Sequence, residues 1–282
     1  MSSDFWWAIH FTPVTASREF VTQSLFAAGC LGIWEKDHEF VAYFSPVKYE
    51  QICLLTAQLL PRLTAPVRVT RQSREDWLEN WKENFLPTPL TANWTVIPSW
   101  WPADPAVQQI IIHPGMAFGT GSHETTRLAA GLLEKILVPG HTVLDVGTGS
   151  GVLAILAHKL GAGQIVAVDI DEEALANCRE NCYLNGCDQA IVCSKGPIAG
   201  IAPTFDLVIA NIIAPTLLEL ASRLTARLKP NGCLILSGIL VEQLSQVRQT
   251  YEQYGLQISE PLIDGEWGAF HVVHQDRPPP VL

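Results

Sequence analysis

Three glycines and two acidic residues in one stretch have the types and spacing of a nucleotide-binding turn. Gly147, Gly149 and Gly151 stand at alternate positions, closely preceded by Asp145 and followed by an apolar helical pattern. Glycine has no Cβ, so it lets the backbone turn tightly and approach a ligand. Asp169 ends the next apolar strand, where an acid can accept hydrogen bonds from both hydroxyls of a ribose. The order strand, glycine turn, helix, strand and acid predicts the first half of a doubly wound nucleotide-binding sheet.

The glycine spacing separates two kinds of cofactor. The dinucleotide fingerprint is G-x-G-x-x-G, whereas this chain has G-x-G-x-G with an acid before it. This variant resembles the S-adenosylmethionine loop of class I methyltransferases. Asn211 ends another apolar strand, and the matching position in amine-directed methyltransferases holds an Asn that aims the attacking nitrogen. Here Pro-Pro and an aromatic do not follow it, in contrast to many of those enzymes.

A glycine-rich run before a predicted helix points to one family. Residues 117–126 read Ala-Phe-Gly-Thr-Gly-Ser-His-Glu-Thr-Thr, and this run resembles the signature of the ribosomal protein L11 methyltransferase family. Ser122 and Glu124 depart from it, since the family usually has Thr and Pro there. The Asn-Ile pattern at 211–212 also resembles this family more than adenine or glutamine methyltransferases.

The resemblance implies methylation, dependent on S-adenosyl-L-methionine, of lysine and possibly N-terminal amino groups on a large-subunit ribosomal protein. It also implies that Thr126, Gly147, Asp169 and Asn211 contact the cofactor or sit beside it. Two alternatives stay open: a methyltransferase of the same fold that acts on another protein or a small amine, and a binding module without activity. The sequence identifies no dedicated catalytic residue, because a positioned neutral amine needs little further chemistry. His123 is either a loop or cofactor contact or the holder of a structural hydrogen bond.

The elements around these motifs predict an α/β fold. The expected class is a seven-stranded, Rossmann-like class I methyltransferase domain preceded by a small α+β ferredoxin-like domain. Its last two strands, 256–263 and 267–274, are joined by a tight Asp264-Gly265 turn, and an antiparallel final pair resembles the methyltransferase arrangement. Before the catalytic half, strand and helix patterns alternate as βαββαβ, the ferredoxin-like unit.

Four segments are expected along the chain. Residues 1–72 form a substrate-recognition domain, and 73–108 a linker helix and loop with a short strand near 94–97. The helix at 73–85 opens with a capping-box pattern at Ser73 and carries Trp77 and Trp81 on one face. Residues 109–275 form the methyltransferase domain, and 276–282 a disordered tail.

The composition and charge of the chain indicate its cellular environment and the kind of partner it binds. The 282 residues are 48% hydrophobic, yet no apolar run reaches the ~18 residues of a membrane helix. The first residues lack the basic segment of a signal peptide, so we expect a cytoplasmic protein with no membrane association. The net charge of −10 disfavours direct nucleic acid binding and suits a basic protein partner.

The seven cysteines give no framework of paired spacings. Four of them cluster as C-x3-C-x4-C-x5-C, namely Cys178, Cys182, Cys187 and Cys193. This cluster lacks the C-x-x-C pairs of zinc sites. The spacing therefore favours reduced core thiols, and no metal site is expected.

Overall fold

The chain forms two compact units, which divide between Leu86 and Pro87. The computed structural model describes residues 5–14, 17–30, 32–36, 39–45, 49–73, 85–114, 121, 123–201 and 203–274. Among these ranges, none of the helices is long and apolar enough to cross a membrane. The predicted helix at 73–85, with Trp77 and Trp81, lies almost entirely outside the described residues, and so does the tail.

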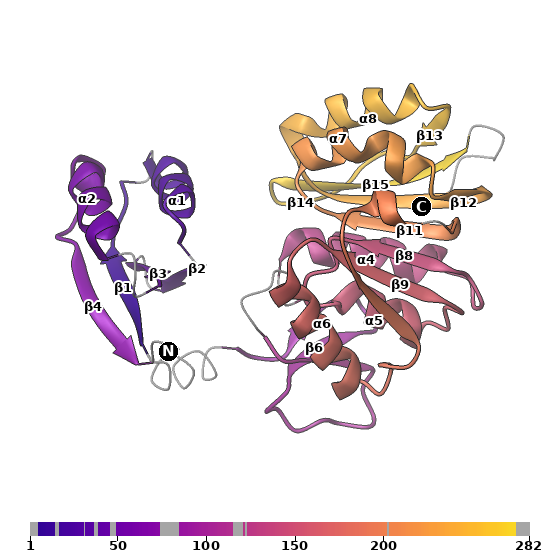
Figure 1. Cartoon of the computed structure of the whole chain (residues 1–282), viewed down its shortest axis with the longest axis horizontal. Coiled ribbons are helices and arrows are strands. Elements are labelled where there is room, and N and C mark those ends of the chain that lie inside the picture. The colour runs from indigo at the N-terminus through magenta and orange to yellow at the C-terminus, as the bar shows by residue number, and fades with distance from the viewer. Residues whose placement is uncertain are drawn as a thin grey trace. The chain divides into compact units, whose positions relative to one another are not determined.

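The first unit is an antiparallel sheet with the strand order β2-β3-β1-β4 and two helices (Figure 1). Its elements follow the chain order βαββαβ: β1 (Phe5–Phe11), α1 (Arg18–Ala27), β2 (Gly32–Lys36), β3 (Glu39–Phe44), α2 (Tyr49–Leu59) and β4 (Arg68–Ser73), with a 3-10 turn at Leu60–Arg62. The ferredoxin-like domain predicted from the sequence is therefore confirmed. Ser73, the expected helix cap, pairs with Phe5 as the last residue of β4.

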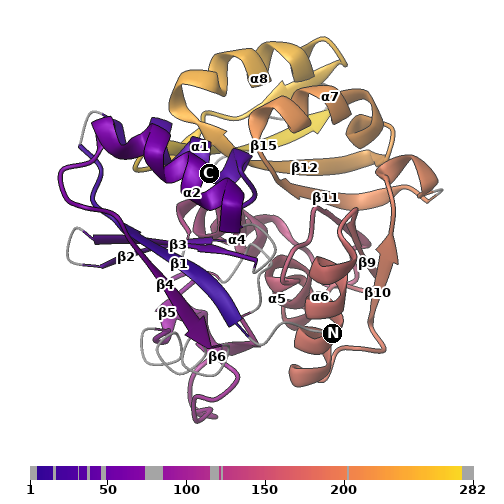
Figure 2. The same cartoon turned by 60° about the vertical axis from the view of Figure 1, so that its left-hand side comes forward.

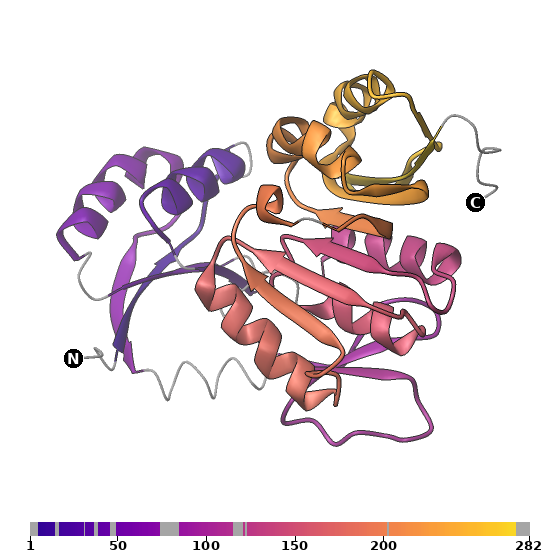
Figure 3. The ribbon, with the colours of Figure 1, turned by 45° about the vertical axis from the view of Figure 1, so that its right-hand side comes forward.

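Alternation along the strands decides which face of this sheet is covered. Ile9 pairs with Ala42 and Phe11 with Phe40, so these side chains share one face and are buried. They pack with residues of both helices, such as Val21, in a single core. Figures 2 and 3 show α1 and α2 on the same face of the sheet.

The second unit is built on a mostly parallel sheet with the order β10-β9-β8-β11-β12-β15-β13. Its strands are β8 (Val143–Val146), β9 (Ile165–Asp169), β10 (Ile191–Lys195), β11 (Phe205–Asn211), β12 (Leu228–Leu240), β13 (Leu256–Ile258), β14 (Leu262–Asp264) and β15 (Trp267–His274). The central strand β8 is buried at every position, as expected where helices cover both faces. The predicted Rossmann-like α/β class is confirmed.

Helices cover the two faces of this sheet in two groups. They are α4 (Glu124–Ile136), α5 (Val152–Lys159), α6 (Glu172–Leu184), α7 (Ala214–Thr225) and α8 (Leu244–Glu252). Residues of α4, α5 and α6 share one hydrophobic core, and residues of α7 and α8 share the other. Figure 1 shows α7 and α8 together on one side of the strands.

One strand differs from the sequence prediction. The expected strand 256–263 is two short strands, β13 and β14, interrupted around Pro261, and both pair with β15. The segment 87–108, predicted as a loop-rich linker with a short strand near 94–97, contains β5 (Thr88–Pro89) and β6 (Thr95–Pro98). Strand β6 runs parallel to β7 (Gln109–Ile112), and Val96 is buried in the core that α4 and α5 share.

Candidate active site

Three of the four predicted site residues meet at one edge of the large sheet. Strand β8 lies between β9 and β11, and Val146 pairs with Val168 on one side and with Ala210 on the other. The next residue of each strand is therefore at the same level: Gly147, Asp169 and Asn211. Ligands of open α/β sheets bind at this carboxyl edge.

The glycine turn between β8 and α5 is tight because its glycines adopt positive φ angles. Gly147 has φ +71° and Gly151 has φ +83°, conformations that other residues rarely adopt. A Cβ on Gly147 would lie 2.5 Å from the side chain of Ile212, and one on Gly151 would lie 2.6 Å from Sγ of Cys178. Both positions therefore need glycine for conformation and for space.

Asp145 anchors the turn from below. It is buried, and its Oδ2 accepts a 2.6 Å hydrogen bond from the hydroxyl of Thr148. Burial raises the pKa of the Asp145 carboxyl to about 6; the nearby charge of Asp169 acts in the same direction, while the bond from Thr148 opposes it. The carboxyl is therefore inside the protein beneath the turn, with no opening toward a ligand.

Asp169 is partly exposed and keeps hydrogen-bonding capacity. One carboxylate oxygen accepts from the backbone N–H of Gly149 and the other from that of Asp171, each at 3.0 Å. A carboxylate has about four acceptor positions. Asp169 can thus hold the glycine turn and still accept two hydrogen bonds from a diol.

The side-chain amide of Asn211 has its nitrogen in a hydrogen bond, whereas its oxygen is available to a ligand. Its Nδ2 donates a long hydrogen bond, 3.4 Å, to Oγ1 of Thr126, which is fully buried on α4. Its Oδ1 is buried and has no hydrogen-bond partner among the described residues. A buried acceptor without a partner is costly, so this oxygen suits an N–H that arrives with a ligand. Thr126 thus meets Asn211 and not the glycine turn.

His123 caps a helix. Its Nδ1 accepts from the backbone N–H of Thr125 at 3.3 Å, and its ring stacks edge-on against Trp267. Burial lowers the pKa of His123, which favours the neutral ring that can accept this bond. The structural hydrogen bond of His123 is therefore present, and a loop or cofactor contact of His123 stays a prediction. Residues 117–120 and 122 of the signature run lie outside the described residues.

The sequence interpretation missed a ladder of asparagines on α6. Asn181 is fully buried; its Oδ1 accepts from the N–H of His113 at 2.6 Å, and its Nδ2 donates to the carbonyl of Ser150 in the glycine turn at 2.8 Å. Asn177 donates to the carbonyl of His113, and Asn185 pairs with both backbone groups of Ile111. The signal was present as asparagines at i, i+4 and i+8, which share a helix face.

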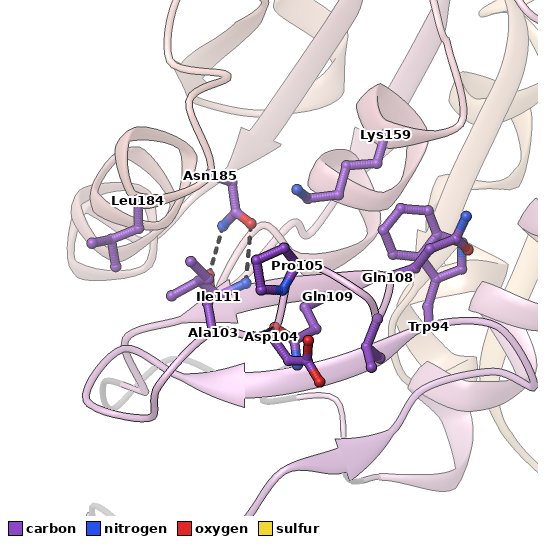
Figure 4. Close-up of a pocket in the computed structure, with 11 residues that line it drawn as sticks. Trp94, Ala103, Asp104, Pro105, Gln108, Gln109, Ile111, Lys159, Leu184 and Asn185 are labelled. Atoms are coloured by element: carbon purple, nitrogen blue, oxygen red, sulfur yellow. Dashed lines mark hydrogen bonds between the residues drawn. The ribbon is translucent and has the colours of Figure 1, made fainter.

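A cavity of about 410 Å³ lies elsewhere in the second unit, at the carboxyl ends of α5 and α6 (Figure 4). It contains none of the four predicted site residues. Its lining residues are Trp94, Ala103, Asp104, Pro105, Val107, Gln108, Gln109, Ile111, Lys159, Leu184 and Asn185. Figure 4 shows the paired hydrogen bonds between Asn185 and Ile111 at its wall. The carboxyl edge of the sheet remains the candidate site, because the turn, the acid and the unpaired amide oxygen converge there.

Comparisons with known proteins agree with this geometry. The family model described as Ribosomal protein L11 methyltransferase (PrmA) matches residues 30–275. The chain is 46% identical over 205 residues to a ribosomal protein L11 methyltransferase of Geobacter metallireducens, covering 72% of this chain and 68% of that one. It is 40% identical over 247 residues to the protein of that name from Trichlorobacter lovleyi, covering 83% and 81%. The crystal structure of a ribosomal protein L11 methylase from Lactobacillus delbrueckii subsp. bulgaricus matches with a TM-score of 0.64 and 36% identity, covering 67% of this chain and 99% of that one.

Proposed function

Because the chain belongs to the ribosomal protein L11 methyltransferase family, we propose that it transfers methyl groups from S-adenosylmethionine to amino nitrogens of ribosomal protein L11. The observation that carries this proposal is the buried Oδ1 of Asn211, an acceptor without a described partner. It lies at the same sheet edge as the glycine turn and the carboxylate of Asp169. An amine nucleophile brings the N–H that this oxygen lacks.

The residues at the edge fit a nucleoside with a positively charged methyl donor. Asp169 has acceptor capacity for the two ribose hydroxyls, and Gly147 allows the ligand to approach the backbone. Thr126 orients the amide of Asn211 through the 3.4 Å hydrogen bond. S-adenosylmethionine supplies an activated methyl group on a sulfonium. The four residues therefore divide into holders of the cofactor (Gly147 and Asp169) and a pair that positions the amine (Asn211 and Thr126).

The acceptor amine is a lysine side chain or an N-terminal amino group. A lysine with a pKa of about 10.4 is neutral in only about one molecule in 2,500 at pH 7. Burial and a neighbouring sulfonium both disfavour the ammonium form. The transfer then depends on placing a neutral nitrogen within about 3–3.5 Å of the methyl carbon, a task for Asn211 and not for a general base.

Methylation of purified L11 tests the proposal directly. We expect the full chain, mixed with unmethylated L11 and S-adenosylmethionine, to raise the intact mass of L11 by whole methyl groups, and peptide mapping should place them on amino nitrogens. A chain that binds S-adenosylmethionine but leaves L11 unchanged would instead act on another protein or a small amine. A chain that does not bind S-adenosylmethionine would be a binding module of the same fold.

A further inference from the structure

The fold brings the sulfur atoms of three of the four clustered cysteines close together. Cys178 and Cys182 lie one turn apart on α6, and Cys193 lies on β10, the strand against which α6 packs. The three Sγ atoms all lie within 4.8 Å of one another, and those of Cys178 and Cys193 are 3.5 Å apart. Each side chain could offer one sulfur to a common centre.

These separations match the dimensions of a thiolate metal site. A Zn–S bond is about 2.3 Å long, so two sulfurs of a tetrahedral site are about 3.8 Å apart. Cys178 and Cys182 are buried, whereas Cys193 is half-buried and gives a path from solvent. Small shifts of side chains would place all three sulfurs around one ion.

A fourth thiol and one cation lie close to this cluster. The thiol of Cys187, just beyond α6, donates a hydrogen bond to the backbone carbonyl of Cys182 at 3.3 Å. Metal ligation requires thiolates, and the positive charge of Arg179, on the same helix, acts on Cys193.

We propose that Cys178, Cys182 and Cys193 bind one thiophilic d¹⁰ cation, Zn²⁺, with Cys187 as the candidate fourth ligand. Binding is a ligand exchange without a change of oxidation state: each thiol that coordinates releases its proton to solvent. Sγ of Cys178 also packs behind Gly151, where it would lie 2.6 Å from an added Cβ. The ion would thus tie α6 to β10 directly behind the glycine turn.

Metal titration of the full chain tests this site. The chain is purified under reducing conditions, stripped with a chelator and titrated with Zn²⁺ in competition with a chromophoric chelator. We expect one Zn²⁺ per chain. Cys178→Ser and Cys193→Ser should each weaken binding at least about tenfold, since each removes a ligand. Cys53→Ser, at an exposed position of α2, and Cys233→Ser, at a buried position of β12, are the matched controls and should bind as the unaltered chain does.

A second measurement does not depend on how the variants fold. Cd²⁺ added to the unaltered chain should produce a thiolate-to-metal charge-transfer band that saturates at one equivalent. Retained S-adenosylmethionine binding by the serine variants would show that their loss of metal is local. The proposal is overturned if the unaltered chain gives neither Zn²⁺ retention nor the Cd²⁺ band. It is likewise overturned if folded Cys178→Ser and Cys193→Ser keep full affinity, or if a disulfide between these cysteines is found in place of the metal.

Discussion

The amide of Asn211 donates to Oγ1 of Thr126 across 3.4 Å, which joins the end of β11 to the first turn of α4. Because the nitrogen is engaged there, the oxygen of the same amide is directed away from Thr126. Within the part of the chain that the structure describes, this orientation leaves Oδ1 of Asn211 as an acceptor without a partner. Thr126 therefore acts on a substrate through Asn211.

Asn211→Ala should slow methyl transfer far more than it weakens cofactor binding. Loss of an orienting contact can cost about 100-fold in rate, whereas Gly147 and Asp169 still hold the cofactor. Single-turnover rates at saturating S-adenosylmethionine measure the effect. Thr126→Val should lower the rate less, and Thr126→Ser, which keeps the hydroxyl, should restore it. A loss confined to cofactor affinity would make Asn211 a binding residue only.

Asp169→Asn should weaken S-adenosylmethionine binding by about 10- to 100-fold, since hydrogen bonds to a charged group contribute about 1.5–3 kcal/mol. The matched control is Asp171→Asn. Asp171 caps α6 through the N–H of Glu173, a bond that Asn can also accept. Calorimetric titration compares the two variants. Equal affinities for Asp169→Asn and the unaltered chain would remove Asp169 from the cofactor site.

Asn181→Ala should impair both stability and cofactor binding. It leaves the N–H of His113 and the carbonyl of Ser150 without their partner, and each buried unpaired group costs about 1–3 kcal/mol. Ser150 belongs to the glycine turn, so the turn should loosen. Asn185→Ala, one turn further along α6, loses its bonds to the backbone of Ile111 and to the carbonyl of Asn181, none of which involves the glycine turn. Asn185→Ala should lower the urea midpoint of unfolding with little change in S-adenosylmethionine affinity. Equal losses of affinity in Asn181→Ala and Asn185→Ala would contradict a role of Asn181 in holding the glycine turn.

The sequence predicted the residues at the carboxyl edge of the sheet, but not the asparagine side chains that hold the glycine turn and β7 in place. Apolar runs that end in Gly147, Asp169 and Asn211 mark strand ends, and adjacent parallel strands bring such ends together. Helical spacing places Asn177, Asn181 and Asn185 on one face, but it does not tell which backbone that face meets. Here the partner is the edge around β7, remote in the chain.

Local patterns do not show which distant residues a predicted segment contacts. Ser73 pairs with Phe5 at the end of β4, and the helix that its pattern predicts stays a prediction, because residues 74–84 lie outside the described residues. The sequence predicts the short strand around Val96, but the burial of Val96 in the core that α4 and α5 share depends on packing against elements later in the chain. The convergence of Cys178 with Cys193 likewise depends on how α6 packs against β10.

Asp145 should make stability rise as the pH falls. Its pKa is about 6 when folded against an ordinary value of 3.8. As the pH falls, the folded state therefore binds the proton at a higher pH than the unfolded state does. Above about pH 6 the buried charge of Asp145 destabilises the folded state by about 3 kcal/mol, and this destabilisation disappears between about pH 6 and pH 4. Asp145→Asn removes this titration, so its stability relative to the unaltered chain should be more favourable at about pH 8 than at about pH 4.5. Urea unfolding at both pH values measures the difference.

The control for this titration is Asp206. Burial opposes its ionisation, but hydrogen bonds from Lys229 and Thr142 outweigh burial and lower the pKa of Asp206 to about 2. Its stabilisation is fully present above 3.8 and is lost only as the pH falls toward 2. Asp206→Asn should therefore destabilise the chain equally at about pH 8 and about pH 4.5. A pH-independent effect of Asp145→Asn as well would show that Asp145 does not titrate in this range.

The first unit should serve recognition of the protein substrate and not cofactor binding. The glycine turn, Asp169, Asn211 and Thr126 all belong to the second unit, which has its own two hydrophobic cores. A unit with its own core can fold alone. A fragment that begins at Pro87 should therefore bind S-adenosylmethionine with the affinity of the full chain but fail to methylate L11. Calorimetry and intact-mass spectrometry measure the two properties on one preparation. Full methylation of L11 by the fragment would contradict a recognition role, and loss of cofactor binding by a folded fragment would show that the first unit contributes to the cofactor site.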